Sequence, residues 1–396
     1  MDSVKSKMNN LIDSMKEQLF EMGDAIYDHP EIGLQEVFAS KLLEDWLENH
    51  GFLVERGLGS MPTAFRAVYE QGTGGPSIGL LTEYDALAGI GHACGHHLQG
   101  PCILAAANAV LRAGIEKPFK LVVYGTPAEE TLGGKINMVQ EGYFRDIDVA
   151  LMMHGSPTTT CDVKSMANYS LDVTFYGKSA HAAINPDKGR SALDALLLTF
   201  QAVEFLREHV KDDVRMHYTV KDTYNIPSNV VSEKATGTFT LRSYNNATLD
   251  DVYRRFKKIT EGAALMTETT CEITENMHMA AKIPALKLNE EIIRCARDVN
   301  APRISPPRQK TGSTDLGNVM ELIPGSCIRV AFVDEHAAAH SQEFLDQGKT
   351  EQGHNAILYG AKILADVCYD LVTIPGLMDE IKADYNAQKE KMKQEA

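Results

Sequence analysis

The sequence predicts an α/β fold in which a helix-covered, largely parallel sheet is interrupted by a smaller α+β module. Length is the first reason, because 396 residues exceed one ordinary domain and favour two domains or one large one. Second, short apolar runs typical of buried strands alternate with helical runs between about residues 77 and 153. Third, between about residues 168 and 284 the pattern changes to strand-helix-strand-strand-helix-strand.

The first part of the chain supplies elements of the larger domain. Residues 4–50 are expected to form two helices, since Pro30 disfavours helix at the residue before it. Three apolar strands and one Ala-rich helix follow, namely strands 77–81, 119–124 and 149–153 and helix 98–113. A strand, helix, strand order at this spacing indicates a mainly parallel sheet covered by helices.

The inserted module has the element order of a ferredoxin-like domain. Its strands are expected at 170–176, 215–220, 235–243 and 271–275, and its helices at 191–209 and 249–267. A helix at 287–298, a strand at 327–332 and a closing helix at 354–371 then return to the first domain. The predicted domains are therefore 1–167 with 285–396, and the inserted 168–284.

Composition excludes several classes of partner. The chain carries 39 Lys and Arg against 54 Asp and Glu, a net charge of -15 without a basic block, so nucleic acid is a poor partner. No apolar stretch approaches the roughly 18 residues of a membrane span, and the acid-containing N-terminus does not resemble a signal peptide. Seven scattered cysteines, an odd number, argue against a disulfide framework and favour the cytoplasm.

A first candidate site follows the strand at 77–81. Cys94 and His96 lie two residues apart, and Gly95 between them permits a tight backbone that brings thiolate and imidazole to one ion. Thiolate and imidazole together suit zinc or another transition metal. The alternative is a hydrogen-bonded polar cluster without metal, and Cys94-x-His96 alone does not decide between them.

Further candidates follow other strands. Glu129 and Glu130 come after the strand at 119–124, and one could ligate a metal while the other acts as a base, although a pair of exposed acids is common. His154 follows the strand at 149–153 and His340 lies in a late loop; a lone histidine is more often structural. Five ligands, enough for two metals about 3.5 to 4 Å apart, are expected together, namely Cys94, His96, Glu130, His154 and His340.

In order along nearly the whole chain, nine motifs resemble those of the dinuclear metallopeptidase family that includes aminoacylase, carboxypeptidase G and succinyl-diaminopimelate desuccinylase. The closer resemblance is to its amidohydrolase branch of aminobenzoyl-glutamate hydrolase-like proteins. The motifs are His29-Pro30-Glu31, Tyr84-Asp85-Ala86-Leu87, His92-Ala93-Cys94-Gly95-His96, Pro127-Ala128-Glu129-Glu130, Met153-His154, Gly177-Lys178-Ser179-Ala180-His181-Ala182, Asn229-Val230-Val231, Gly312-Ser313-Thr314-Asp315 and His340-Ser341.

The resemblance implies roles for the first domain, which would be a zinc-peptidase-like α/β/α catalytic domain. Cys94 matches the bridging metal ligand, Glu129 the general base, and Asp85 the acid that orients a ligand imidazole. The terminal ligands matched are His96, Glu130, His154 and His340. Two divalent ions per subunit are implied, zinc or manganese first and cobalt or nickel as alternatives.

The resemblance also implies a lid and dimerisation role for the inserted module. His181 matches a histidine that reaches across a homodimer interface to steady the substrate carbonyl oxygen. Asn229 and Arg242 resemble residues that hold substrate carboxylate or amide groups, and an equally weighted alternative makes Arg242 a surface residue. His97 departs from the family, which has Asp or Asn there, and adds another imidazole near the ligands.

The expected function is hydrolysis of an amide bond in an N-acyl or N-aminoacyl amino acid or a small dipeptide-like compound. Two other classes stay open at this point. Cys94 could be the nucleophile of a metal-free thiol hydrolase with a nearby histidine as its base. The chain could also be a non-catalytic binding protein that retains the fold.

Overall fold

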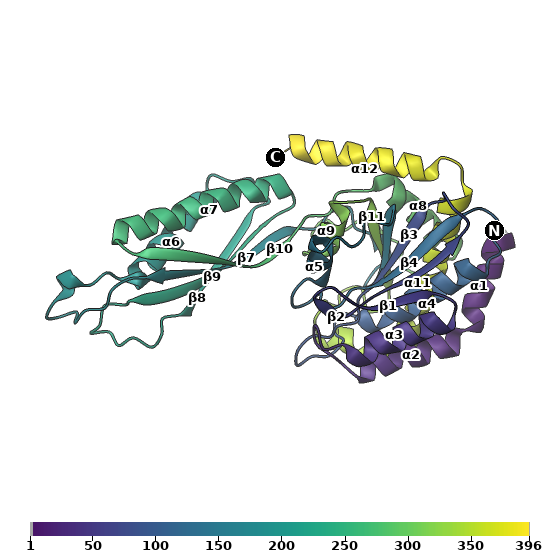
Figure 1. The fold of residues 1–396 in the computed structure, drawn as a ribbon, viewed down its shortest axis with the longest axis horizontal. Coiled ribbons are helices and arrows are strands. Elements are labelled where there is room, and N and C mark those ends of the chain that lie inside the picture. Colours follow the sequence, from purple (N-terminus) through teal and green to yellow (C-terminus); the bar gives the residue numbers. More distant parts are fainter. Residues whose placement is uncertain (1–2, 396) are drawn as a thin grey trace. The chain divides into compact units, whose positions relative to one another are not determined.

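The computed structural model describes residues 3–395, and the chain forms two compact units (Figure 1). The first unit runs up to Lys164 and resumes over Ile283–Lys391. The second comprises Ser165–Lys282 and the segment that begins at Met392. Every candidate metal ligand named above belongs to the first unit.

A seven-stranded sheet in the order β1-β2-β4-β3-β5-β11-β6 forms the centre of the first unit. Its strands are β1 (Leu53–Leu58), β2 (Met61–Gln71), β3 (Ser77–Thr82), β4 (Phe119–Gly125), β5 (Val149–Ser156), β6 (Thr160–Cys161) and β11 (Gly325–Ala331). The four central strands β4, β3, β5 and β11 run parallel, so their carboxyl ends share one edge. Ligand sites in open α/β sheets lie at that edge.

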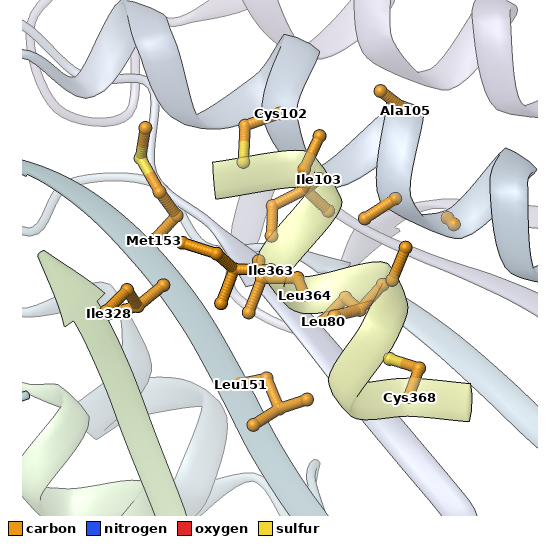
Figure 2. Close-up of a cluster of buried hydrophobic side chains, with 14 of the residues drawn as sticks. Leu80, Cys102, Ile103, Ala105, Leu151, Met153, Ile328, Ile363, Leu364 and Cys368 are labelled. Carbon is orange, nitrogen blue, oxygen red and sulfur yellow. The ribbon is translucent and has the colours of Figure 1, made fainter. Parts of the chain in front are cut away.

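Helices cover both faces of this sheet. The helices of this part of the chain are α1 (Ser3–Ser14), α2 (Lys16–Asp28), α3 (Val37–Asn49), α4 (Gln99–Arg112), α5 (Gly134–Gln140), α8 (Leu286–Asp298), α9 (Leu316–Met320), α10 (Gln342–Asp346), α11 (Glu351–Thr373) and α12 (Leu377–Gln394), with a 3-10 turn at His96–Leu98. Helices α4 and α11 pack on one face, where they meet Leu80, Leu151 and Ile328 (Figure 2).

Alternation of side chains along the strands explains the two cores. Leu80 faces the α4 and α11 side, and its neighbour Leu81 belongs to a second buried cluster that includes residues of α5 and α9. Strands buried on both faces read as continuous apolar runs, which is why β3, β4 and β5 could be predicted from the sequence.

Two features of the N-terminal part of the first unit differ from the expectation. Residues 4–50 form three helices, because the chain interrupts its helical geometry at Met15 before α2 begins. The hairpin of β1 and β2 was not anticipated, and its first strand has the burial of an exposed edge rather than a core strand. Edge strands carry little apolar signal for sequence-based prediction.

The second unit contains β7 (Ala167–Tyr176), α6 (Ala192–Arg207), β8 (Arg215–Asp222), β9 (Lys234–Ser243), α7 (Asn246–Thr267) and β10 (Thr270–Met279). Its antiparallel sheet has the order β10-β7-β9-β8, and α6 and α7 pack on it around a core of its own. Ser191 and Asn245 cap the two helices through their side chains, as these residue types commonly do.

Two sequence-based expectations concern the whole chain. Within the described residues, no helix combines the length and apolarity that a membrane crossing requires. None of the seven cysteines forms a disulfide within the described chain.

Candidate metal centre

The candidate ligands gather at the carboxyl edge of the parallel strands in the first unit. Glu129 and Glu130 follow β4, and His154 lies near the end of β5. Cys94 and His96 lie on the connection between β3 and α4, with Gly95 in the left-handed region at φ 83. Glycine adopts this conformation without steric cost, which turns the backbone between the two ligand side chains.

A first group consists of Cys94, His96 and His154, whose ligand atoms all lie within 4.8 Å of one another. The Cys94 Sγ and His154 Nε2 atoms are 3.5 Å apart. Cys94 and His96 are buried, so they come together away from bulk solvent. One thiolate and two imidazoles form a ligand set typical of zinc and similar ions.

A second group shares one member with the first. Cys94, Glu130 and His340 also place their ligand atoms within 4.8 Å of one another. His340 Nε2 lies 3.2 Å from Glu130 Oε1, and the His340 backbone N–H donates to the Ala93 carbonyl at 3.0 Å. Because Cys94 belongs to both groups, its sulfur lies within ligand distance of the members of each.

The histidine tautomers suit metal binding. His96 Nδ1 lies 3.0 Å from the Asp85 carbonyl oxygen and 3.1 Å from Asp85 Oδ1, so the proton of a neutral ring belongs on Nδ1 and Nε2 would be the atom that faces an ion. That Nε2 atom is buried and makes no hydrogen bond within the described chain. His154 Nδ1 lies 2.7 Å from the Gly155 carbonyl oxygen, so its Nε2 likewise faces Cys94. A carboxylate or carbonyl behind the imidazole is the usual arrangement at metal sites.

The electrostatics of the centre favour a cation. Burial alone would raise the pKa of the Cys94 thiol, but the imidazoles of His96 and His154 lower it to about 6. Hydrogen bonds with Cys94 and Glu130 raise the pKa of His340 to about 10. Burial raises the pKa of Glu130, yet His340 and His96 lower it to about 2. A cation at this position would displace the proton that these anions hold on His340.

Glu129 lies between this centre and a second set of carboxylates. It forms one ligand-distance group with His96 and Glu130, and another with Glu83 and Asp315. Burial, and then the charge of Glu83, raise the pKa of Glu129 well above its usual value. A general base must hold the proton that it takes until it donates that proton as an acid. A carboxyl group with a raised pKa holds a proton in this way.

Sequence reasoning missed the group formed by Glu83, Lys135 and Asp315. The Lys135 ammonium is fully buried and donates to Glu83 at 2.6 Å and to Asp315 at 2.7 Å. Glu83 in turn lies 3.3 Å from His96 Nε2 and accepts from the Gln99 amide at 2.7 Å. The available signals were Glu83 next to Tyr84-Asp85 and Asp315 in the Gly312-Asp315 loop.

His97 does not join either ligand group. Its Nε2 atom lies 3.0 Å from the Gly348 carbonyl oxygen, and its ring makes an edge contact with Tyr27. Burial lowers the pKa of His97 to about 4, so this imidazole is neutral. Among the described residues, the extra imidazole is thus a packing residue behind the metal centre.

The three remaining site candidates lie in the second unit. His181 and Asn229 are neighbours, because His181 bridges to Val230 and the Ala182 N–H donates to the Asn229 carbonyl at 2.9 Å. Both side chains are exposed. Strand β9 begins at Lys234, a few residues after Asn229, and Arg242 lies near its other end, about 26 Å from Lys234 along the strand at the usual rise per residue. The structure therefore groups His181 with Asn229 and separates Arg242 from them.

A parallel sheet that carries two overlapping groups of Cys, His and carboxylate ligands, with a further acid beside them, defines a hydrolase of the metallopeptidase class. The chain belongs to peptidase family M20/M25/M40, whose model matches residues 79–370. This membership agrees with the family inferred from the sequence motifs.

Named relatives cover almost all of the chain. It is 30% identical to one of the subunits of p-aminobenzoyl-glutamate hydrolase from Escherichia coli, covering 97% of this chain and 95% of that protein. It is also 30% identical to the human Xaa-Arg dipeptidase, covering 97% and 92% respectively. The chain is accordingly an enzyme of the amidohydrolase and peptidase class, among the metal-dependent amide hydrolases.

Solved structures share the fold. An aminobenzoyl-glutamate utilization protein from Klebsiella pneumoniae superposes with a TM-score of 0.71 at 19% identity, over 91% of this chain and 97% of that one. A dinuclear metal-binding peptidase of the M20 family from Bacillus subtilis gives a TM-score of 0.66 at 17% identity, over 89% and 98%. The predicted α/β fold with its parallel sheet is confirmed.

Proposed function

We propose that this enzyme hydrolyses the amide bond of N-acyl or N-aminoacyl amino acids or of small dipeptide-like compounds. One observation carries the proposal: two ligand groups share the Cys94 sulfur, and Glu129 lies within ligand distance of both His96 and Glu130. This is the arrangement in which one water can be held between two ions and meet a base.

The residues present fit two divalent ions. Cys94, His96 and His154 would hold one ion, and Cys94, Glu130 and His340 the other. The buried His96 Nε2 atom, which makes no hydrogen bond with any described residue, gives this fit a structural reason. Zinc or manganese is proposed first, and cobalt or nickel are the alternatives. When bound, such ions polarise a substrate carbonyl and lower the pKa of a shared water.

Glu129 is proposed as the group that moves the proton. It would take a proton from the attacking water and deliver it to the departing nitrogen, which must leave as a neutral amine. Burial and the nearby Glu83 carboxylate make protonated Glu129 more stable, so the first transfer is favoured. Asp85 keeps the His96 ring in the orientation that exposes Nε2 to the centre.

The second unit is proposed to act as the lid and to form a homodimer, in which His181 and Asn229 would contact the substrate. Two apolar side chains on α6 support an interface: Leu197 is 48% and Phe205 72% exposed. Strand β8 also lies at the edge of its sheet. Arg242 is retained as a candidate for the substrate carboxylate. A cytoplasmic location is proposed because cysteines that form no disulfide within the described chain suit a reducing compartment.

Metal analysis and an activity panel test the proposal. Purified protein should contain about two divalent ions per chain, and it should hydrolyse members of a panel of acyl- and aminoacyl-amino acids. A chelator should abolish this activity, and adding back zinc or manganese should restore it. Activity that survives metal removal and is abolished by iodoacetamide would instead support Cys94 as a nucleophile, which its pKa of about 6 and its contact with His154 favour.

The role of Glu129 gives the first prediction. Glu129→Gln should lower kcat by about 10²- to 10⁴-fold, because the amide cannot carry the proton. Metal content should stay at the wild-type value, as measured by mass spectrometry of the digested protein. Glu130→Gln is the matched comparison and should lose metal. If Glu129→Gln lost metal and Glu130→Gln did not, the two carboxylates would have the reverse roles.

A further inference from the structure

The backbone immediately before the proposed base has an unusual conformation. Ala128 adopts a left-handed φ of 60°, although it is not glycine. A residue with a Cβ atom reaches this region only at an energetic cost, so its surroundings must hold it there. The Ala128 carbonyl closes the following turn by accepting from Leu132 at 3.1 Å and Gly133 at 2.9 Å. The direction in which Glu129 leaves β4 depends on this turn.

Glu36 contacts the turn from another part of the chain. Its carboxylate is fully buried, and Oε1 accepts the Ala128 backbone N–H at 2.8 Å. Its Oε2 atom accepts the Thr63 hydroxyl at 2.8 Å. Each carboxylate oxygen therefore has a donor, one from the turn and one from β2.

Glu36 occupies the N-cap position of α3, yet its side chain does not cap that helix. Residues at this position usually direct a side-chain oxygen to the first turn of their own helix. Here Glu31 supplies that cap, accepting the N–H groups of Phe38 at 2.9 Å and Ala39 at 3.0 Å. The Glu36 carboxylate therefore bonds to the Ala128 turn and not to α3, while α3 holds the Glu36 backbone in place.

The backbone N–H of the residue after Glu129 is held in the same way. The Glu130 N–H donates to Asp85 Oδ2 at 2.9 Å, and Asp85 is also buried. Two buried carboxylates, from segments far apart in the sequence, therefore bond the N–H groups immediately before and after Glu129. Fixing the backbone N–H groups of the residues on both sides of Glu129 restricts the direction of its side chain.

We propose that Glu36 is a positioning residue for catalysis, which holds the left-handed Ala128 turn and so directs Glu129 at the reacting water. The inference rests on the proposed role of Glu129 and extends it to a residue that touches neither ligands nor substrate. An error of about 1 Å in the placement of a catalytic group can lower a rate by about 10²-fold.

The kinetic test compares three variants. Glu36→Met keeps the side-chain length but removes the acceptor, so kcat should fall about 10- to 100-fold with KM changed less than about threefold. Glu36→Gln keeps an oxygen for the Ala128 N–H and should restore kcat to within about threefold of wild type. Thr63→Val is the matched control, because it removes the other hydrogen bond of Glu36, and it should also stay within about threefold. Metal content should be unchanged in all three.

A second readout does not depend on any substrate. Hydrogen exchange at the amides of residues 126 and 128–133 should be slow in the wild type and in Glu36→Gln, and faster in Glu36→Met. A wild-type Ala128 amide that exchanges as fast as an exposed loop amide would overturn the inference, even if Glu36→Met failed to fold. So would full kcat in Glu36→Met, or a loss in Glu36→Gln equal to that in Glu36→Met. Absence of wild-type hydrolysis across the panel would count against the proposed function, and the exchange measurement would still judge the role of Glu36.

Discussion

Two clusters of the first unit place a cysteine within ligand distance of acidic side chains. The first, the metal-centre cluster, comprises Cys94, His96, Glu130, His154 and His340. The second, here called the Lys5 cluster, comprises Lys5, Glu291, Arg294, Cys295 and Asp370. The residue types overlap, but the partners of the acids differ.

The Lys5 cluster contains its own cations. Lys5 forms an ion pair with Asp370, and Arg294 lies 2.6 Å from Glu291 and 2.5 Å from Asp370. Burial raises the pKa of the Cys295 thiol, whereas the imidazoles lower that of Cys94 to about 6. An ion would have to displace an ammonium and a guanidinium from the Lys5 cluster, but only protons from the metal-centre cluster. Proximity of ligand atoms alone therefore does not define a metal site.

The largest expected effect is at Cys94. Cys94→Ser should lose one or both ions and reduce kcat/KM by at least about 10³-fold, since the shared thiolate ligand of both groups is removed. Cys295→Ser should keep both the metal content and the activity of the wild type. The metal is measured by mass spectrometry after gel filtration, and the activity with the best substrate of the panel.

Either of two results would remove the distinction between the clusters. Metal lost from Cys295→Ser would place an ion in the Lys5 cluster. An inactive Cys94→Ser that keeps two ions would favour the nucleophile hypothesis over the bridging ligand.

Removing the charge of Lys5 should lower the stability of the chain and leave its metal content unchanged. Lys5→Met leaves Asp370 buried with less compensation, and breaking a buried ion pair costs about 3–5 kcal/mol. The free energy of unfolding, measured by urea titration, should fall by about that amount while metal content is unchanged. The double variant Lys5→Met/Asp370→Leu should recover much of the loss, because apolar residues can replace a buried pair. An equal loss in the double variant would show that Lys5 stabilises the chain by packing alone.

Most of the metal-centre cluster was predictable because its members follow strands that the sequence marks clearly. The apolar runs of β3, β4 and β5 identify the strands, and parallel strands bring Cys94, Glu130 and His154 to one edge. Whether these side chains bind ions stays a prediction, although the structure brings them together as expected.

The residues behind the centre were not predictable for a physical reason. Lysine is almost never fully buried unless it is paired, and the partners of Lys135 lie 52 and 180 residues away in the sequence. The same applies to Glu36, whose contact with Ala128 spans 92 residues. No periodicity encodes such pairs, because each depends on how the packed elements meet. The exposed strand β1 could not be predicted for a related reason, since it has no apolar pattern.

The smallest effect is expected at Asp366, a buried acid whose negative charge is compensated less strongly than that of Asp370. It is fully buried on α11, one turn from Asp370, and burial raises its pKa to about 7 although Lys5 and Asn9 lower it. The unfolded chain releases this proton near an ordinary pKa of about 3.9. Between about pH 4 and about pH 7 the folded chain therefore holds a proton that the unfolded chain has lost, so this contribution to stability decreases as the pH rises.

Replacing this carboxyl group isolates its contribution to the pH dependence. Asp366→Asn cannot titrate, so from about pH 5.5 to about pH 7.5 the wild type should lose about 2 kcal/mol of unfolding free energy relative to the variant. Urea titrations at both pH values measure the difference, and other ionising groups cancel because they are common to both proteins. A wild-type curve parallel to that of the variant would mean that folded Asp366 titrates like an exposed acid. In that case a retained proton would not distinguish Asp366 from Asp370, whose partners are Lys5 and Arg294.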